Sequence, residues 1–403
     1  MKIHKHILLD VLDSLEIIFG EQKHADKVIE KALKSHNKWG GRDRKFFAES
    51  VYEIVRNWRY LWFLLNKDVS LHREDLFEIF GVWWFVQHRD ILTYPELAEL
   101  KASKLLERIE KAKKLPAIEQ SFQDWTYERL QKELGDETPD LMKALNQKAE
   151  VVLRVNLLKT NLLALQERLL ADGIETEVLG ADYPDGIALK IRKNVFITGA
   201  FKEGHFEMQD GSSQKVAHFM KIEPGMRIID ACAGAGGKTL HIASLMKNKG
   251  KIIAMDIEDF KLTEMKRRLR RAGVDIAETK LIDSTKVIKR LEGTADRVLL
   301  DVPCSGLGVL RRNPDTKWKI TVDRLEELRE IQKEILKDYS KMVKKGGYLI
   351  YATCSLLPSE NREQVDWFLE QNPGHWELEE DLKLFPNKDR FDGFYVSRMK
   401  RLS

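Results

Sequence analysis

The second half of the chain alternates between short apolar runs and stretches with the apolar spacing of a helix, and this alternation constrains the fold most strongly. A connection between parallel strands has to cross the sheet from end to end, and a helix usually makes that crossing. The pattern therefore predicts a doubly wound, mostly parallel α/β sheet within residues 211–403. The expected strands lie at residues 226–229, 252–255, 280–282, 298–300 and 348–351.

Residues 1–145 lack this alternation and are predicted to be helical throughout. Apolar residues recur at intervals of three and four from Ile7 to Ile18, which is the spacing of a buried helix face. Aromatic residues are dense between Phe46 and Phe85, and at helical spacing such residues belong to a core more often than to a base-stacking surface. We therefore expect an all-helical domain here.

Between these halves, residues 146–210 show a mixed pattern. Residues 151–156 are mostly apolar and β-branched and predict a strand, residues 161–172 predict a helix, and further strand-like pieces close the segment. This pattern predicts a small α+β bridging domain. The helix that follows is expected to be capped by Ser212 or Ser213.

The composition is typical of a soluble globular protein with two or three domains. The 403 residues are 43% hydrophobic and 33% charged, and no apolar run approaches the roughly 20 residues that span a bilayer. The first helical pattern carries Asp10 and Asp13, which a secretory signal would not, so we expect a cytoplasmic protein that binds no membrane. The three cysteines, Cys232, Cys304 and Cys354, lie too far apart for a metal motif, and no metal is expected.

The net charge of +4 is too small to indicate nucleic-acid binding by itself. Local clusters of Lys and Arg are better evidence of nucleic-acid binding than the net charge, because concentrated positive charge attracts phosphate groups. Such a run is equally often a solvated helix face. The clusters lie at residues 111–114, 266–271 and 311–312.

Two cysteines directly follow predicted strands, at the edge where open α/β sheets bind ligands. Cys304 lies three residues after Asp301, where an apolar run breaks into Pro, Ser and Gly, and Cys354 follows the run at residues 348–351. A free buried cysteine is usually a small hydrophobic residue, but positions at strand ends favour chemistry. These motifs therefore predict an active site with a carboxylate and thiols.

The first predicted strand ends at Asp230 and turns into a helix through a run of small residues. Such residues let the backbone approach a ligand closely, and the amides of the helix N-terminus then face it. A phosphate loop would need Gly in place of Cys232, and a dinucleotide loop would need Gly in place of Thr239. The loop therefore favours S-adenosylmethionine. It reads Ala231–Cys232–Ala233–Gly234–Ala235–Gly236–Gly237–Lys238.

Two further aspartates follow the second and third predicted strands. Asp256 lies about 20 residues beyond the loop, where a carboxylate can accept both hydroxyls of a ribose. Asp283 is placed to accept an adenine amino group. Either residue alone could instead cap the next helix. Together with the loop and Asp301, they put an acidic or glycine element at four consecutive strand ends, which indicates one ligand site.

Three motifs closely resemble those of the NOP2/Sun (RsmB-like) family of S-adenosylmethionine-dependent RNA cytosine-5 methyltransferases: residues 301–308, 311–315 and 353–361. Residues 42–56 resemble the NusB-like RNA-binding domain, and RsmB-type members have the same order of NusB-like half, bridge and catalytic domain. The resemblance implies a Rossmann-like class I methyltransferase domain. One departure is Ala235, where the family usually has Pro, and this change is expected to loosen the loop.

The resemblance also implies a role for each site residue. Cys354 is the nucleophile that adds to carbon 6 of cytosine, Cys304 assists the later elimination, and Asp301 hydrogen-bonds the base with Lys238 nearby. The implied cofactor contacts are Cys232, Ala233, Gly234, Ala235, Gly236, Gly237, Lys238, Asp256, Asp283 and Asp301. The implied substrate-binding residues are Pro303, Arg312 and Asn361.

The sequence thus predicts a monomeric enzyme that makes 5-methylcytosine in RNA, with small-subunit ribosomal RNA as the expected partner. Two alternatives stay open. A non-catalytic RNA-binding or ribosome-assembly factor would keep the helical half but would not need the thiols, and a tRNA-directed cytosine-5 methyltransferase would share the whole site. A protein or DNA amino-methyltransferase needs no thiol pair.

Overall fold

The computed structural model describes residues 4–403, and the chain divides into two compact units. One unit comprises the chain up to Gln147 together with Leu310–Val322, and the other comprises Lys148–Val309 and Asp323–Ser403. A short segment of the predicted catalytic range, residues 211–403, therefore belongs to the first unit. The sequence did not lead us to expect this division.

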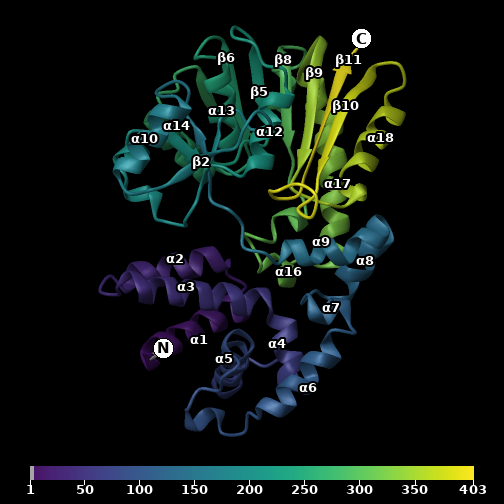
Figure 1. Ribbon diagram of the computed structural model, residues 1–403. Coiled ribbons are helices and arrows are strands. Elements are labelled where there is room, and N and C mark those ends of the chain that lie inside the picture. Colours follow the sequence, from purple (N-terminus) through teal and green to yellow (C-terminus); the bar gives the residue numbers. More distant parts are fainter. Residues whose placement is uncertain (1–3) are drawn as a thin grey trace. The chain divides into compact units, whose positions relative to one another are not determined.

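The first unit is helical, as predicted (Figure 1). Helix α1 buries Ile7, Val11 and Leu15, which lie one turn apart on one face. The predicted aromatic core is confirmed, because residues such as Phe47 and Trp62 are buried in one apolar cluster. No helix of the described chain is long and apolar enough to cross a membrane. The helices are α1 (Lys5–Gly20), α2 (Ala25–Ser35), α3 (Gly41–Arg56), α4 (Trp58–Leu65), α5 (Arg73–His88), α6 (Ala102–Ala112), α7 (Pro116–Glu119), α8 (Asp124–Leu134) and α9 (Thr138–Leu145).

The segment Leu310–Val322, which contains the short helix α16 (Thr316–Lys319), packs into this helical unit. The Trp318 ring packs against the aromatic core, and its Nε1 donates to the carbonyl of Val55 at 2.7 Å. In return, the Arg56 guanidinium donates to the carbonyl of Arg311 at 3.1 Å. The segment is therefore an integral part of the helical core.

The second unit begins with a small antiparallel sheet in the order β2-β3-β1-β4, which confirms the predicted α+β character of this region. Asn161 caps helix α10 as its side chain accepts from the amide of Ala164 at 3.0 Å. The elements are β1 (Val152–Val155), α10 (Leu162–Ala171), β2 (Thr176–Val178), β3 (Gly186–Leu189), α11 (Gly199–Lys202) and β4 (Phe206–Met208).

The cap of the next helix, α12 (Gly211–Phe219), differs from the prediction. Asp210 occupies the capping position, and its side chain accepts from the amide of Ser212 at 2.9 Å. The expected caps, Ser212 and Ser213, lie inside the first turn. The Asp210 carboxylate caps α12 because it lies one residue before the helix, where its oxygen can accept a hydrogen bond from a free backbone amide of the first turn.

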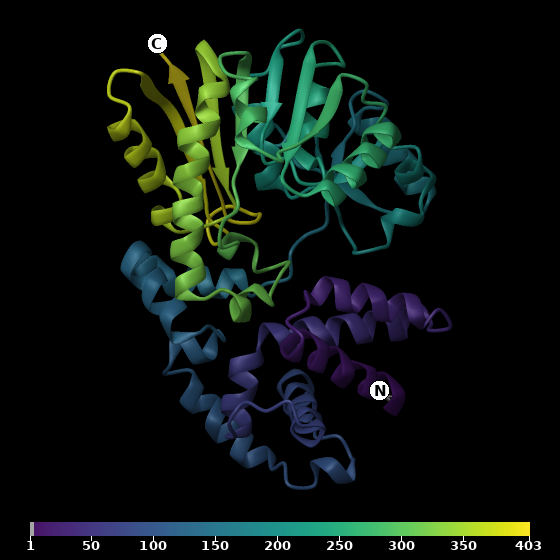
Figure 2. The same ribbon diagram turned by 180° about the vertical axis from the view of Figure 1, so that it is seen from behind.

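The large sheet has the order β10-β11-β9-β8-β5-β6-β7, and the strands from β9 to β7 are parallel. Successive strand residues point to opposite faces: Ile228 packs with helices α12 and α13, whereas Ile229 joins the cluster that contains Leu336 and Phe368 from α17 and α18. Helices therefore cover both faces (Figures 1 and 2), and the predicted doubly wound sheet is confirmed. The helices are α13 (Gly237–Leu245), α14 (Asp259–Ala272), α15 (Thr285–Lys289), α17 (Val322–Tyr339) and α18 (Arg362–Gln371).

The five predicted strands are all present, at β5 (Arg227–Asp230), β6 (Lys251–Asp256), β7 (Ala277–Leu281), β8 (Ala295–Asp301) and β9 (Val343–Thr353). The antiparallel edge formed by β10 (Trp376–Leu384) and β11 (Phe394–Arg401) was not predicted. Strand β10 is mostly charged and only partly buried, so it lacks the apolar run by which the other strands were found.

Candidate active site

The glycine loop between β5 and α13 is built from tight backbone turns. Gly234 and Gly236 have φ angles of 54° and 85°, a region that residues with a Cβ rarely adopt. A Cβ on Gly236 would also lie 2.5 Å from the side chain of Met265 on α14. The loop therefore needs glycine at this position both for its backbone conformation and for its close approach to α14.

Arginines hold the carbonyl groups of this loop. Arg154 of β1 donates to the carbonyl of Gly237 at 2.7 Å, and Arg268 of α14 donates to the carbonyl of Ala235 at 2.8 Å. We expected Ala235 to loosen the loop because the family usually has Pro there. The hydrogen bond from Arg268 fixes this residue by another route.

Asp256 ends β6 and is buried beneath the loop. Its Oδ2 accepts from the amide of Gly234 at 2.8 Å, and its Oδ1 accepts from the amide of Glu258 at 2.9 Å. A carboxylate has about four acceptor sites, so each oxygen keeps capacity for a ligand hydroxyl. Asp283 lies just beyond β7 and is exposed.

Asp301, the last residue of β8, forms an ion pair with Lys238 from the first turn of α13. The Lys238 Nζ lies 2.5 Å from an Asp301 oxygen, and it also lies 5.1 Å from the centre of the Phe394 ring. The Lys238 side chain is 12% exposed and that of Asp301 is 31% exposed. The carboxylate is therefore held in place and remains open to a ligand.

The two predicted thiols lie side by side. Cys304 follows β8 and Cys354 follows β9, which are parallel neighbours with Asp301 opposite Ala352. The two Sγ atoms are 3.3 Å apart. The contact with Cys354 and burial raise the pKa of the Cys304 thiol well above its usual value. Cys304 is thus held as a protonated thiol against the second sulfur.

Cys232 has no thiol partner of this kind. Burial and the nearby carboxylates of Asp230 and Asp301 raise its pKa well above the usual value, so it carries no reactive thiolate. This environment is consistent with the backbone role that the loop position indicated.

The three predicted substrate-binding residues lie in different environments. Pro303 is exposed beside Cys304. Arg312 is half-buried in the segment that belongs to the helical unit. Asn361 is buried, its amide donates to the carbonyl of Ser355 at 3.0 Å, and its oxygen accepts from Thr353. These bonds indicate that Asn361 holds the turn around Cys354, and its contact with substrate stays a prediction.

The basic clusters are partly used inside the protein. Arg268 and Arg271 both pair with the buried carboxylate of Glu207, and Arg311 is buried with its Nε donating to the carbonyl of Ala144 at 2.9 Å. These guanidinium groups stabilise the fold. Three residues of the cluster on α14 are exposed and do not pair with Glu207: Lys266, Arg267 and Arg270.

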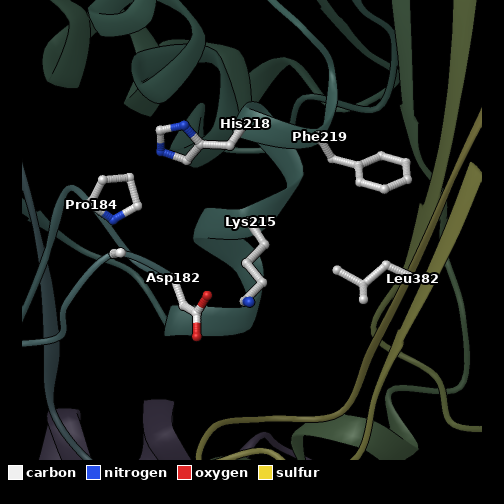
Figure 3. A pocket seen from close by; sticks show the side chains of 7 residues that line it. Asp182, Pro184, Lys215, His218, Phe219 and Leu382 are labelled. Atoms are coloured by element: carbon white, nitrogen blue, oxygen red, sulfur yellow. The ribbon is translucent and has the colours of Figure 1, made fainter.

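A separate open cavity of roughly 360 Å³ lies beside α12 (Figure 3). Asp182, Lys215 and His218 line it together with Phe219 and Leu382. None of the predicted site residues contributes to its wall. The cavity is therefore distinct from the thiol site at the strand ends.

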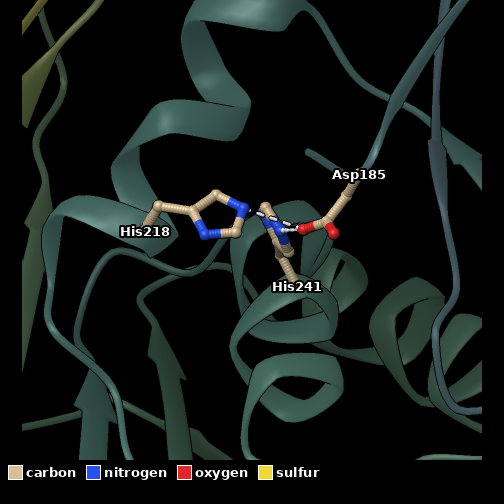
Figure 4. Close-up of side chains that lie close together, drawn as sticks. All are labelled: Asp185, His218 and His241. Atoms are coloured by element: carbon tan, nitrogen blue, oxygen red, sulfur yellow. Dashed lines mark hydrogen bonds and ion pairs between the residues drawn. The ribbon is translucent and has the colours of Figure 1, made fainter. Parts of the chain in front are cut away.

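Next to this cavity, Asp185 accepts hydrogen bonds from two histidines (Figure 4). The Nε2 atoms of His218 and His241 each lie 2.8 Å from the same Asp185 oxygen, and such a trio has the ligand types of a metal site. Burial and the charge of Arg154 lower the pKa of His241 to about 3, and a nearby guanidinium disfavours a cation.

The second nitrogen of His241 also argues against a metal. Its Nδ1 is buried and has no hydrogen-bond partner in the part of the chain that the structure describes, whereas a metal-bound histidine almost always donates its other N–H to an acceptor. We interpret the cluster as a hydrogen-bonded contact that ties the small sheet to α12 and α13.

The parallel sheet, the glycine loop and the acidic residues at the strand ends define a Rossmann-like, S-adenosylmethionine-dependent methyltransferase. Comparison with protein families agrees with this class. The family described as 16S rRNA methyltransferase RsmB/F matches residues 217–400. The ferredoxin-like domain of RsmF/B-like methyltransferases matches residues 122–196, which begins earlier than the predicted bridge at residues 146–210.

Individual relatives cover nearly the whole chain. A probable ribosomal RNA small subunit methyltransferase B from Synechocystis is 31% identical over 96% of this chain and 97% of its own. A protein of the same description from Bacillus subtilis is 28% identical over 98% of both chains. One solved structure, 25% identical, covers 100% of both chains with a TM-score of 0.80. The chain belongs to the RsmB/F family of 16S rRNA methyltransferases.

S-adenosylmethionine is the cofactor of this class, and the residues present fit it. The loop backbone is open to a ligand at Gly234 and Gly237, where an added Cβ would meet no other atom of the described chain within 4 Å, and Asp256 has free acceptor capacity for ribose hydroxyls. Ile257, the residue after Asp256, is 70% exposed and offers an apolar surface beside this carboxylate. We did not single out Ile257 from the sequence, although its position directly after a strand-end aspartate was a usable signal.

Proposed function

We propose that this methyltransferase makes 5-methylcytosine in small-subunit ribosomal RNA, with Cys354 as the nucleophile. The observation that carries the proposal is the pair of thiols, 3.3 Å apart, at the ends of neighbouring strands β8 and β9. A methyltransferase that acts on an amino group needs no thiol. The names of the relatives, which specify the small ribosomal subunit, support this choice of RNA.

The chemistry explains the need for two sulfurs. Carbon 5 of cytosine is a weak nucleophile, and addition of the Cys354 thiolate to carbon 6 turns the ring into an enamine that can accept a methyl group at carbon 5. S-adenosylmethionine supplies that methyl group as an electrophile. Cys304, after it has lost its own proton to solvent, takes the carbon 5 proton as a thiolate. The bond between carbon 6 and the Cys354 sulfur then breaks, its electron pair leaves with that sulfur as a thiolate, and the ring is restored.

Asp301 is proposed to bind the ring edge at nitrogen 3 while negative charge builds up there. For this purpose the group must present a proton or act together with a cation, and Lys238 at 2.5 Å provides the cation. The pair is partly exposed, so a base can reach it. A base inside a duplex cannot, and the target must therefore be flipped out or lie in a loop.

Two alternatives are less well supported. A non-catalytic assembly factor would have no use for the thiol contact or for the arginines that hold the glycine loop. A tRNA-directed enzyme would need the same site, but the relatives named above are ribosomal RNA methyltransferases. The proposal describes a monomeric cytoplasmic enzyme that acts without a metal ion.

Bisulfite sequencing of 16S ribosomal RNA tests this proposal. RNA from a strain that lacks the gene should lose 5-methylcytosine at one or more positions, and the purified protein with S-adenosylmethionine should restore it. A Cys354→Ala protein serves as the control and should restore none. If the methylation pattern is unchanged in the deletion strain, ribosomal RNA is not the substrate.

A further inference from the structure

A fully buried carboxylate joins the two turns that carry the thiols. Glu360 is 0% exposed and lies six residues after Cys354, next to Asn361. Its Oε1 accepts from the backbone amide of Ser305 at 2.8 Å, and its Oε2 accepts from the Ser305 hydroxyl at 2.5 Å and from the Ser355 hydroxyl. Ser305 follows Cys304 and Ser355 follows Cys354, so one side chain is bonded to both cysteine turns.

The network continues on both sides of Glu360. Gln332 of α17 donates from one Nε2 to Glu360 at 3.1 Å and to the carbonyl of Pro303 at 3.0 Å. Tyr351 of β9 donates to the Glu360 carbonyl at 2.6 Å. Gln332 and Tyr351 are fully buried as well. The residue before Cys304 and the strand before Cys354 are therefore tied to the same point.

The burial of this group is unusual for a charged side chain. In the part of the chain that the structure describes, Glu360 forms no ion pair, and its partners are the amide, hydroxyl and carboxamide donors named above. Buried carboxylates are costly unless every acceptor site is used, and a buried Gln or Leu would avoid that cost. The site therefore indicates a purpose beyond packing.

The strands alone do not fix the sulfurs. Register between β8 and β9 sets the positions of Asp301 and Ala352, and both cysteines lie after these last paired residues. One backbone hydrogen bond joins the two turns, from the amide of Gly308 to the carbonyl of Cys354 at 2.9 Å, and it lies four residues beyond Cys304. A displacement of about 1 Å in a reacting group costs on the order of a hundredfold in rate. A restraint on the residues directly after both cysteines therefore adds to that bond and keeps the sulfurs in contact.

We propose that Glu360 is a positioning residue that holds the Cys304 and Cys354 turns together and so keeps the two sulfurs side by side. This inference rests on the proposed function for its role in catalysis, but the geometric part can be tested without RNA. The nearby charge has a second effect: after the Cys354 contact and burial, Glu360 also raises the pKa of the Cys304 thiol. Glu360 therefore helps to keep Cys304 protonated while Cys354 reacts.

A trivalent arsenical measures whether the sulfurs are held together. Phenylarsine oxide reacts with two neighbouring thiols to form two arsenic–sulfur bonds and releases one water, whereas a single thiol holds it weakly. The wild-type protein should bind the reagent tightly through Cys304 and Cys354. Cys304→Ser gives the single-thiol baseline, because one of the two sulfurs is then missing.

Glu360→Ala should weaken arsenical binding by roughly tenfold or more towards that baseline, because the turns separate. The matched control is Glu363→Ala, three residues along on α18, where the side chain is 58% exposed. That variant should bind like the wild type. Methyl transfer by Glu360→Ala should show a lower kcat with an unchanged KM for S-adenosylmethionine, because the cofactor loop is untouched.

Glu360→Gln separates position from charge. A glutamine can keep an acceptor oxygen towards the Ser305 amide and donate its NH₂ to the two serine hydroxyls, so arsenical binding should persist. Alkylation of Cys304 by iodoacetamide should then begin at a lower pH than in the wild type, because the neighbouring negative charge is gone. A purely packing role would leave this pH profile unchanged.

Should Glu360→Ala fail to fold, the double variant Ser305→Ala, Ser355→Ala removes the two hydroxyl donors and leaves the carboxylate in place. It should weaken arsenical binding in the same direction. Wild-type arsenical binding in either folded variant would overturn the proposal. If the arsenical result holds but no 5-methylcytosine is made by the wild type, the proposed function fails and the positioning role of Glu360 stands.

Discussion

At the scale of a single residue, Asp256 both holds the cofactor loop by hydrogen bonds and is predicted to bind the cofactor. Its oxygens already hold the amides of Gly234 and Glu258, and we predict that they also accept ribose hydroxyls of the cofactor. Asp256→Ala should weaken S-adenosylmethionine binding by roughly 1–3 kcal/mol, the cost of unmade hydrogen bonds to a charged group. Titration calorimetry measures this change. Asp259→Ala, an exposed carboxylate three residues on, is the control, and equal affinities in the two variants would exclude Asp256 from the site.

Asp230 makes folding stability depend on pH. Burial raises its pKa to about 7 in the folded protein, against about 3.9 in an unfolded chain. The folded state therefore binds the proton more tightly, so its stabilising contribution is complete below about pH 4 and is lost as the pH rises through 7. Asp230→Asn removes this titration, and between pH 5 and pH 8.5 the variant should gain about 3 kcal/mol of stability relative to the wild type. Urea unfolding of both proteins across this range checks the prediction, and a stability difference that is constant with pH would contradict it.

At this scale the sequence predicted residues at strand ends well and their partners poorly. Asp301, Cys304 and Cys354 were found because each follows an apolar run within its own motif. The bonds that fix them come from residues far away in the chain, as with Gln332 reaching Pro303 across 29 positions. No local pattern contains such a contact.

At the scale of elements, the small sheet supports the cofactor loop of the large one. Arg154 on β1 is 2% exposed and donates both to Gly237 and to the side chain of Gln209. Burial lowers the pKa of Arg154 to about 10, so it stays charged at neutral pH. The predicted bridging segment is therefore also a brace for the site.

Removing this brace should affect stability and cofactor binding together. Arg154→Met removes a donor from the Gly237 carbonyl and from the Gln209 oxygen, and we expect a loss of about 1–3 kcal/mol in the free energy of unfolding and weaker S-adenosylmethionine binding. Arg168→Met is the control, because Arg168 makes a surface ion pair with Glu203 on the same small domain and should cost less than about 1 kcal/mol. Urea unfolding and calorimetry measure both effects. Unchanged cofactor affinity in Arg154→Met would show that the loop needs no brace.

The elements themselves were largely predictable. Most of the parallel strands can be predicted from apolar runs that are buried on both faces, as in β6, where five consecutive residues are buried. The edge strand β7 has no buried residue. Strand β10 does not, because its exposed residues are mostly charged and only its pairing with β11 makes it a strand. Edge strands depend on their neighbour more than on their own sequence.

At the scale of the whole molecule, the segment Leu310–Val322 leaves the catalytic sequence and joins the helical unit. Lys317 lies at its centre and is 1% exposed. Its Nζ donates to the carbonyls of Arg56 and Ser121 at 3.2 and 3.1 Å and to the side chain of Asn146 at 2.6 Å. These acceptors lie near the C-terminal ends of α3, α7 and α9, where helix carbonyls lack partners. Deleting residues 1–145 would therefore strip Lys317 of most of its partners, so such a truncation is no clean test of RNA binding.

Lys317→Met should destabilise the helical unit. Methionine keeps an unbranched chain of similar length but leaves several buried carbonyls without a donor, so we expect a loss of about 2–5 kcal/mol in the free energy of unfolding. Lys34→Met, which removes an exposed ion pair with Glu30 in the same unit, should cost less than about 1 kcal/mol. Thermal or urea unfolding followed by tryptophan fluorescence reports on this unit, because Trp318 lies beside Lys317 in its core. Equal losses in the two variants would mean that Lys317 is not central to the packing.

The trapping of RNA on cysteine variants tests the central claim, that the two thiols have different roles, most directly. Protein is incubated with 16S-type ribosomal RNA and S-adenosylmethionine and run on a denaturing gel. Cys304→Ala should accumulate as a covalent RNA complex, because Cys354 still adds to carbon 6 and the methyl group is transferred while elimination stalls. Cys354→Ala should form no complex and no 5-methylcytosine. A covalent complex that appears with Cys354→Ala and not with Cys304→Ala would contradict the account and would make Cys304 the nucleophile.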